Sequence, residues 1–181
     1  MNTVRLKDLW IRWYHYYFAN REKFGITLDE LQQVGVEDES IIVEERVGTS
    51  LLALDTALKT HNYALVVKDG YRSKEMYKLI YEKRTILYGK EATDRTLNMK
   101  NMAHSTWRAV DVSIVDVKTE QELLFKNNDH GIEWRATLYY ESSKDPVEQQ
   151  MHGNRIFLRD TMKEYWFRGI PNEYRHFEYE L

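Results

Sequence analysis

The chain has 181 residues, and its 26 Lys and Arg, 29 Asp and Glu, 6 His and no Cys leave a formal net charge of −3. A chain of this length suits one domain that buries its own core, so it needs no disulfides. The lack of Cys excludes a disulfide scaffold, a thiolate metal site and a cysteine nucleophile, and the negative charge argues against a protein that clamps nucleic acid by bulk charge.

No segment is typical of a targeting signal or a membrane span. Residues 1–8 lack the apolar core of a signal peptide, and no stretch approaches the roughly 18 uninterrupted apolar residues of a membrane helix. As written, the sequence predicts a cytoplasmic protein without a membrane span, or a periplasmic or secreted one if a leader has been removed.

The first predicted elements are helical. Aromatic and aliphatic side chains recur at helical spacing over residues 6–18, which predicts a helix with an aromatic stripe. Thr27 and Glu30 have the spacing of a capping box, which indicates a turn or the start of a short helix. Apolar residues then repeat along one face over residues 40–60 and predict a longer helix: Val47, Leu51, Leu54 and Leu58.

The middle of the chain alternates strands with a helix. Residues 63–67 are short, apolar and β-prone, so they predict a strand. Ser73 and Gly89 are a plausible N-cap and a plausible end for a helix between them, and a polar loop follows over residues 90–103. Alternating residues over 109–115 predict a second strand.

The last third is less regular. Residues 120–148 give few signals, and a short strand near residues 134–140 is the one element that we expect there. Residues 154–168 predict a helix that ends before Gly169, and residues 174–181 alternate as a final strand. Since regular βαβ spacing is missing, we expect a single α+β domain over residues 1–181, with helices packed on a small, mostly antiparallel sheet and a helical N-terminal segment over residues 1–46.

Three short motifs concentrate reactive side chains. The first, Asp69-Gly-Tyr-Arg72, joins a predicted strand to a predicted helix, where a guanidinium can bind a carboxylate or a developing oxyanion. The second has His104 seven residues before Asp111, across a turn from loop to strand, and both are good zinc ligands. Taken singly, each motif is more common as a structural feature, such as a surface Arg or an Asp that hydrogen-bonds a His.

The third motif, Glu173-Tyr-Arg-His176, completes a possible metal site. His104, Asp111 and His176 form a set of two imidazoles and one carboxylate, and three protein ligands leave the fourth position of a tetrahedral zinc ion open for water. This is the pattern of a catalytic zinc. Glu173 would then be the general base, and Arg72 would stabilise charge on the reacting carbonyl.

The motifs resemble those of the zinc D-alanyl-D-alanine dipeptidases of the vancomycin-resistance type, within the wider zinc D,D-peptidases. That family carries Asp-x-Tyr-Arg, then Ser-x-His-x-x-Gly-x-Ala-x-Asp, then Glu-x-x-His-Phe. This chain has, in the same order and spacing, Asp69-Gly-Tyr-Arg72, Met102-Ala-His-Ser-Thr-Trp-Arg-Ala-Val-Asp111 and Glu173-Tyr-Arg-His-Phe177. The resemblance runs from Val47 to the C-terminus and leaves residues 1–46 unmatched.

The resemblance implies a zinc D,D-peptidase-like fold, one Zn²⁺ per chain and a small peptide substrate. It implies that His104, Asp111 and His176 bind the zinc, that Glu173 is the general base, and that Arg72 stabilises the tetrahedral intermediate. It also implies hydrolysis of a D-Ala-D-Ala-type, peptidoglycan-derived peptide bond by metal-activated water, with no nucleic-acid partner. The oligomeric state is not readable from the sequence.

The chain departs from the family at positions that concern the substrate. Met102 replaces the family's Ser, Trp107 replaces its Gly, and Arg135 replaces the final Asp of Asp-Met-Gly-x-x-Phe-Asp, which is matched here by Asp129-His-Gly-Ile-Glu-Trp-Arg135. An acid at that last position suits the free ammonium group of a dipeptide, whereas Arg135 would repel an ammonium and attract a carboxylate. Tyr71, Trp107 and Arg135 are therefore candidate substrate contacts.

Three other functions remain open. The protein could be a D,D-carboxypeptidase or related amidase that acts on an N-blocked or longer peptide. It could be a zinc-binding module without activity, although an intact Glu173 and Arg72 argue against this. It could also be a sugar-binding or protein-interaction domain that uses its N-terminal aromatic residues, with an accidental His/Asp set.

Overall fold

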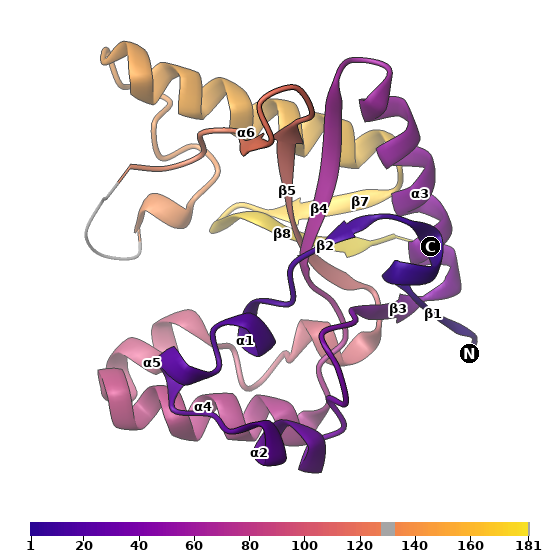
Figure 1. The fold of residues 1–181 in the computed structure, drawn as a ribbon. Coiled ribbons are helices and arrows are strands. Elements are labelled where there is room, and N and C mark those ends of the chain that lie inside the picture. Colours follow the sequence, from indigo (N-terminus) through magenta and orange to yellow (C-terminus); the bar gives the residue numbers. More distant parts are fainter. Residues whose placement is uncertain (128–132, 181) are drawn as a thin grey trace.

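The computed structural model describes residues 1–127 and 133–180, which form two sheets with helices packed around them (Figure 1). The larger sheet has the order β2-β4-β5-β8-β7, with β6 paired to β5, and its pairs are antiparallel apart from the parallel β2–β4 pair. Its strands are β2 (Arg12–Trp13), β4 (Tyr63–Asp69), β5 (Ala109–Asp116), β6 (Gln121–Glu122), β7 (Phe167–Ile170) and β8 (Glu173–Tyr179). The smaller sheet pairs β1 (Thr3–Arg5) with β3 (Ile42–Glu44). The predicted α+β class with a small, mostly antiparallel sheet is confirmed.

The helices divide between two apolar clusters. Their bounds are α1 (Tyr16–Ala19), α2 (Leu28–Gln33), α3 (Glu45–Lys59), α4 (Lys74–Tyr88), α5 (Lys90–Thr96) and α6 (Pro146–Glu164). The larger cluster joins α3 and α6 to the sheet through residues such as Leu51, Val67 and Leu158. The smaller cluster joins α1, α2 and α4 to Leu97, the residue that follows α5, and Figure 1 shows these four helices together at the lower end of the molecule. The site described below lies where the two clusters meet.

Local capping explains the helices that the sequence predicts best. The Thr27 hydroxyl accepts the backbone N–H of Glu30 at 3.1 Å, and the Glu30 carboxylate accepts the N–H of Thr27 at 2.8 Å, so the capping box of α2 is confirmed. Ser73 accepts the N–H of Met76 at 3.0 Å and begins α4. Gly89, at φ 81°, ends α4 as predicted.

The expected N-terminal helix over residues 6–18, and with it a wholly helical segment over residues 1–46, is wrong. Residues 6–9 form a short 3₁₀ helix, Trp10 turns the chain at φ 58°, and β2 then pairs with β4 before α1 begins. The aromatic spacing is therefore divided between a strand and a four-residue helix. Spacing along the chain cannot detect this, because the pairing of β2 depends on a distant strand.

Other predicted boundaries also change. The helix expected over residues 40–60 begins only at Glu45, since β3 precedes it, and the expected loop over 90–103 contains α5. The helix expected over 154–168 begins at Pro146, where Asp145 caps it, and ends at Glu164, after which Trp166 turns the chain at φ 69° into β7. A 3₁₀ turn over Glu133–Arg135 and further turns replace the strand expected near 134–140.

Two parts of the sequence-based interpretation fall on positions outside the described residues. These are Asp129 to Ile132, in the segment matched to Asp-Met-Gly-x-x-Phe-Asp, and Leu181, in the last predicted strand. Among the helices that the structure describes, none has the length and apolar character required to cross a membrane.

Candidate metal centre

A row of side chains crosses the centre of the larger sheet. Asp111 on β5 lies directly opposite Asp69 on β4 and His176 on β8. Residues directly opposite one another in antiparallel strands point to the same face, so strand pairing alone brings these three side chains together. Apolar neighbours of Asp111, such as Val110 and Val112, face the other side and pack in the larger core.

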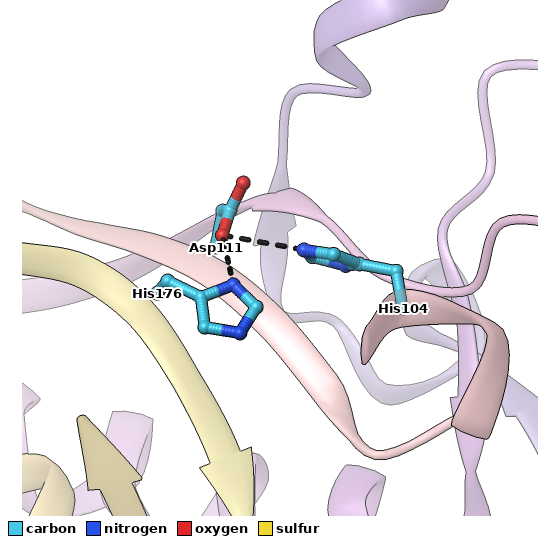
Figure 2. Close-up of side chains that lie close together, drawn as sticks. All are labelled: His104, Asp111 and His176. Atoms are coloured by element: carbon cyan, nitrogen blue, oxygen red, sulfur yellow. Dashed lines mark hydrogen bonds and ion pairs between the residues drawn. The ribbon is translucent and has the colours of Figure 1, made fainter. Parts of the chain in front are cut away.

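His104 reaches this row from the 3₁₀ helix η3 (Ala103–Thr106), just before β5. Its Nε2 lies 3.4 Å from Oδ1 of Asp111, and Nδ1 of His176 lies 3.0 Å from the same oxygen (Figure 2). The structure thus brings together the three predicted ligands, and these atoms could hold a metal ion. Both imidazoles are buried, so a bound ion would be largely screened from bulk water.

The surroundings fix the His104 ring. The Gly70 carbonyl oxygen lies 2.8 Å from Nδ1 of His104, so Nδ1 carries the hydrogen and the lone pair of Nε2 faces Asp111. The backbone N–H of His104 donates to the Tyr77 hydroxyl at 3.0 Å. On the other side, Nε2 of His176 lies 3.6 Å from Oε1 of Glu178. Each imidazole therefore directs one nitrogen at Asp111, and a hydrogen bond to the protein holds the other nitrogen of His104.

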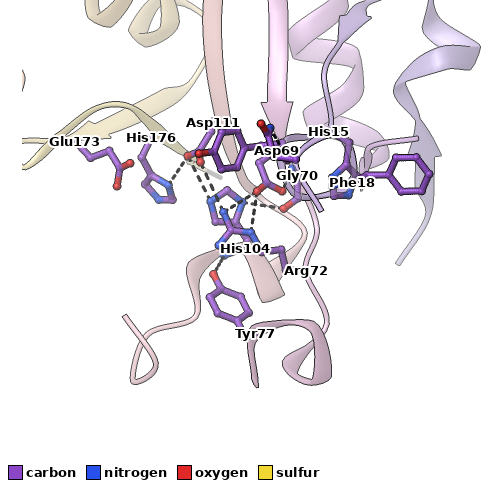
Figure 3. Close-up of polar contacts among 12 residues, drawn as sticks. His15, Phe18, Asp69, Gly70, Arg72, Tyr77, His104, Asp111, Glu173 and His176 are labelled. Atoms are coloured by element: carbon purple, nitrogen blue, oxygen red, sulfur yellow. Dashed lines mark hydrogen bonds and ion pairs between the residues drawn. The ribbon is translucent and has the colours of Figure 1, made fainter. Parts of the chain in front are cut away.

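Arg72 is held beside the same row, mostly buried. Its Nε and Nη2 lie 2.9 Å and 2.7 Å from Oδ2 of Asp69, and Nη2 lies 3.7 Å from Oδ2 of Asp111 (Figure 3). The guanidinium also lies over the rings of Tyr17 and Tyr77, 5.1 Å and 5.2 Å from their centroids. One cation therefore separates two neighbouring carboxylates and faces the predicted ligands.

Charge and burial set the protonation of the group. Burial alone would raise the pKa of the Asp111 carboxyl, but the imidazoles of His104 and His176 outweigh it and hold that pKa well below its ordinary value. Burial lowers the pKa of His176, yet its hydrogen bond to Asp111 and the nearby acids raise it overall. Burial likewise lowers the pKa of Arg72, and Asp69 more than compensates. Asp111, a predicted ligand, is thus anionic at neutral pH.

Glu173 begins β8 and forms an ion pair with Arg135, which ends the short turn at Glu133–Arg135. Both side chains are about one-fifth exposed, at 22% for Glu173 and 19% for Arg135, and both line the same cleft as the three ligands. The predicted base is therefore near the predicted ligands but bonded to an arginine. The sequence gives no sign of this contact, because 38 residues separate the two partners.

The cleft is larger than a dipeptide needs. It encloses about 1570 Å³ and runs from the three ligands past Tyr77 and Tyr81 of α4 to residues 94–101. Pockets that enclose a whole drug-sized ligand commonly measure about 300–1,000 Å³. The cleft can therefore accept a chain of several residues.

Two of the three candidate substrate contacts lie elsewhere. Tyr71 and Trp107 stack face to face, with ring centroids 3.3 Å apart, and neither is among the described residues that line the cleft. Met102 and Trp107 both adopt positive φ, at 43° and 69°. The loop thus follows a left-handed path at these two positions, and Met102 packs against the smaller apolar cluster.

The structure also adds residues to which the motifs assign no role. Gly70 provides the carbonyl that orients His104, Tyr77 supports the same residue, and Tyr17 covers Arg72. Motif spacing cannot reveal a backbone carbonyl, and Tyr17 lies in the segment that the motifs leave unmatched. In the sequence, the one indication of these additional roles is that Gly70 lies within the first motif.

Several solved structures are similar to this chain. The LdcB LD-carboxypeptidase has 19% sequence identity and a TM-score of 0.50, over 76% of this chain and 59% of that chain. DacB from Streptococcus pneumoniae D39 has 20% identity and a TM-score of 0.46, over 76% and 66%. The vancomycin resistance D,D-dipeptidase VanXYg, solved with a D-Ala-D-Ala phosphinate analog, has 19% identity and a TM-score of 0.46, over 81% and 53%. The matched region thus spans between half and two thirds of each of these chains.

No curated protein sequence matches the chain. A family profile described as D-ala-D-ala dipeptidase, of peptidase family M15, does match it over residues 19–180. This match includes residues 19–46, for which the motifs alone showed no resemblance, and all of the residues in the candidate metal centre. The chain therefore belongs to the D-ala-D-ala dipeptidase family of M15 peptidases.

Proposed function

We propose that the protein is a zinc-dependent peptidase that hydrolyses a D-Ala-D-Ala-type, peptidoglycan-derived peptide bond. The observation that carries this proposal is the convergence of His104, Asp111 and His176 on one point of a cleft that Glu173 and Arg72 also line. Membership of a peptidase family supports the reaction type.

The donor set fits zinc in kind and in spacing. Ligand atoms about 2.0–2.1 Å from a tetrahedral zinc ion lie about 3.3 Å from one another. The separations of 3.0 Å and 3.4 Å between Oδ1 of Asp111 and the two imidazole nitrogens are close to this value, and all three ligand atoms lie within 4.8 Å of one another. When bound, zinc would polarise the scissile carbonyl and lower the pKa of a water molecule to about 7.

The chain's own residues would then position the reactants and move the proton. Glu173 would take a proton from the attacking water and return it to the leaving amine. Arg72 would stabilise the negative charge that develops on the carbonyl oxygen, because Asp69 and two tyrosine rings hold its guanidinium beside the ligands. Burial of the imidazoles would keep competing water away from them.

A second candidate, a D,D-carboxypeptidase or related amidase acting on an N-blocked or longer peptide, has its own support. Arg135, although paired with Glu173, lines the cleft at the position where the family has an acid suited to a free ammonium group, and the cleft volume of about 1570 Å³ exceeds the needs of a dipeptide. Under this candidate the zinc chemistry is unchanged, and only the accepted substrate differs. A zinc-binding module without activity remains the outcome if zinc binds and no peptide is cleaved.

The test combines metal analysis with a hydrolysis screen. We expect about one zinc per chain, and cleavage of peptides ending in D-Ala-D-Ala, with the N-acylated peptide preferred over the free dipeptide. Glu173→Gln should abolish turnover and leave zinc content unchanged, because Glu173 is not a ligand. A chain that binds no zinc, or a Glu173→Gln variant that keeps near-normal activity, would contradict the proposal.

A further inference from the structure

Five arginines line the cleft, and their charge partners differ. Arg72 is paired with Asp69, Arg95 with Glu91, and Arg135 with Glu173. Arg175 also lines the cleft, yet no carboxylate of the described residues lies within ion-pair distance of it. Arg84, whose Nη2 donates to Thr96, likewise has no ion pair among the described residues, but of the two only Arg175 is next to the predicted ligand His176 in the sequence.

The Arg175 side chain has a defined position. It is partly buried on β8, and Nη2 donates to the Tyr174 hydroxyl at 2.6 Å, with the guanidinium 5.1 Å from the centroid of that ring. Tyr174 is only 3% exposed, stacks on Phe125 at 5.5 Å, and has Arg155 4.3 Å from its ring centroid. Because Tyr174 is fixed from several sides, one arm of Arg175 is held in place.

The acids whose charges act on Arg175 are already engaged. Asp111 is shared by the two imidazoles. Glu122 accepts hydrogen bonds from Lys68 at 2.6 Å and from Ser113 at 2.5 Å. A guanidinium has five N–H donors, of which the Tyr174 hydroxyl takes one. The other donors are therefore available to an acceptor that enters the cleft.

We propose that Arg175 is a specificity residue that binds a carboxylate of the peptide substrate, an inference that rests on the proposed peptidase function. Arg175 is adjacent in sequence to the predicted ligand His176, and both residues line the same cleft. The carboxylate of a one-residue leaving group lies about 4–5 Å beyond the scissile carbonyl, within reach of a long side chain beside the predicted ligands. A planar guanidinium at this position matches a carboxylate in shape and charge.

Two groups on a peptide offer this chemistry, and the experiment separates them. One is the terminal carboxylate of the residue released by hydrolysis, and the other is an acidic side chain beside the scissile bond. We would measure hydrolysis of three matched N-acylated peptides: one with a free C-terminus, one with a C-terminal amide, and one amide that carries a glutamate next to the scissile bond. Each would be tested with the unmodified chain, Arg175→Gln and Arg175→Lys.

For the unmodified chain we expect kcat/KM for the free-acid peptide to exceed that for the plain amide by roughly 30- to 100-fold, the size expected for a charged hydrogen bond. Arg175→Gln should remove this preference, mainly through KM, and leave the amide unchanged. Arg175→Lys should restore part of it, since it keeps the charge but loses the planar fork. Arg168→Gln, an exposed change on β7, is the matched control. If the unmodified chain instead prefers the amide that carries a glutamate, the acidic side chain of the peptide is the carboxylate that Arg175 binds.

Binding without turnover provides the independent readout. Calorimetry would compare Glu173→Gln with the double variant Glu173→Gln/Arg175→Gln. Arg135 lacks its Glu173 carboxylate partner in both variants, so the two differ only at Arg175. We expect the double variant to bind the free-acid peptide at least about 30-fold more weakly, and the amide equally. If the two bind the free acid equally, or if Arg175→Gln slows acid and amide peptides alike, the carboxylate site is wrong. If Arg175-dependent binding persists but no peptide is ever cleaved, the site stands and the proposed activity fails.

Discussion

At the scale of a single residue, Gly70 both orients a predicted ligand and allows close packing of the backbone. Its carbonyl oxygen accepts the Nδ1 hydrogen of His104 at 2.8 Å. A Cβ at this position would lie 2.5 Å from Cγ2 of Ile41 and 2.9 Å from the carbonyl oxygen of Ile42. No larger residue fits without movement of the segment before α3. The smallest side chain is therefore required where the backbone itself orients a predicted ligand.

We expect Gly70→Ala to shift this backbone and weaken zinc binding about 10- to 100-fold, the usual effect of losing a partner of a metal-binding histidine. The variant should also lower the melting temperature. Competition with a zinc chelator and thermal unfolding measure the two effects. Gly153→Ala on α6 is the control, because an added methyl group there would have nothing within 4 Å and Ala favours a helix. Equal zinc affinity in the two variants would contradict this role.

The Tyr77 hydroxyl, which contacts His104, makes the stability of the fold depend on alkaline pH. Burial raises the pKa of its hydroxyl to about 12, although the Arg72 charge and the N–H of His104 act in the opposite direction. Because the folded pKa lies above the ordinary value of 10.0, the neutral hydroxyl contributes stability that is fully present below pH 10 and is lost as the pH rises through about 12. We therefore expect Tyr77→Phe to flatten the alkaline fall in the free energy of unfolding. Denaturant unfolding at several alkaline pH values, with Tyr81→Phe as control, checks this.

At the scale of elements, helix α6 holds the segment that carries Arg135. Fully buried Arg155 on α6 donates from Nε to the Phe125 carbonyl at 2.8 Å and from Nη1 to the Ala136 carbonyl at 2.7 Å. Its charge also lies over the rings of Tyr140 and Tyr174. One side chain thus connects α6 to Phe125 and to Ala136, which lie on the two flanks of the segment that carries Arg135.

Arg155→Met should free these flanks without disturbing the ligands. Each buried carbonyl left without its donor costs about 1–3 kcal/mol, so we expect lower stability and faster hydrogen exchange over residues 133–140. Zinc affinity should stay the same, because His104, Asp111 and His176 lie on η3, β5 and β8. Hydrogen exchange followed by mass spectrometry, with exposed Arg159→Met on the same helix as control, makes the comparison. Unchanged exchange over residues 133–140 would show that other contacts hold the segment.

How far the sequence predicts each element depends on where its signal lies. Helices α2 and α4 carry their caps within a few residues, and β5 carries its own alternation, so local reasoning identifies them. Residues 12–13 and 167–170 become strands only by pairing with β4 and β8. For the candidate site, the spacing of motifs predicts His104, Asp111 and His176 as ligands, and the structure brings these three residues together. The Arg135–Glu173 contact and the Tyr17 ring over Arg72 arise from distant parts of the chain and give no local signal.

At the scale of the whole molecule, the candidate centre joins the two apolar clusters. His176 and Asp111 come from the sheet, while Tyr77 and Tyr17, which contact His104 and Arg72, belong to the cluster of α1, α2 and α4. The aromatic N-terminal segment, whose role the sequence leaves open, therefore supplies part of this support. A metal ion bound at the junction should stabilise the fold as a unit.

We expect zinc to raise the melting temperature, because an ion that binds only the folded state adds about 2.7 kcal/mol to the free energy of unfolding at about 100 times its Kd. Chelation should reverse the shift. His104→Ala should abolish it, whereas His61→Ala, an exposed change outside the cleft, should preserve it. Thermal unfolding with and without zinc measures this. A shift that survives His104→Ala would locate the ion elsewhere.

The pairing of β5 with β8 determines whether the predicted ligands meet at all. Asp111 faces His176 only in the observed register, and a slip of one residue would direct His176 to the opposite face of the sheet. A misfolded chain with shifted strands would therefore bind zinc poorly, even with every ligand present in its sequence. Metal affinity would then report on the fidelity of strand pairing, so a zinc column would separate correctly folded chains from misregistered ones.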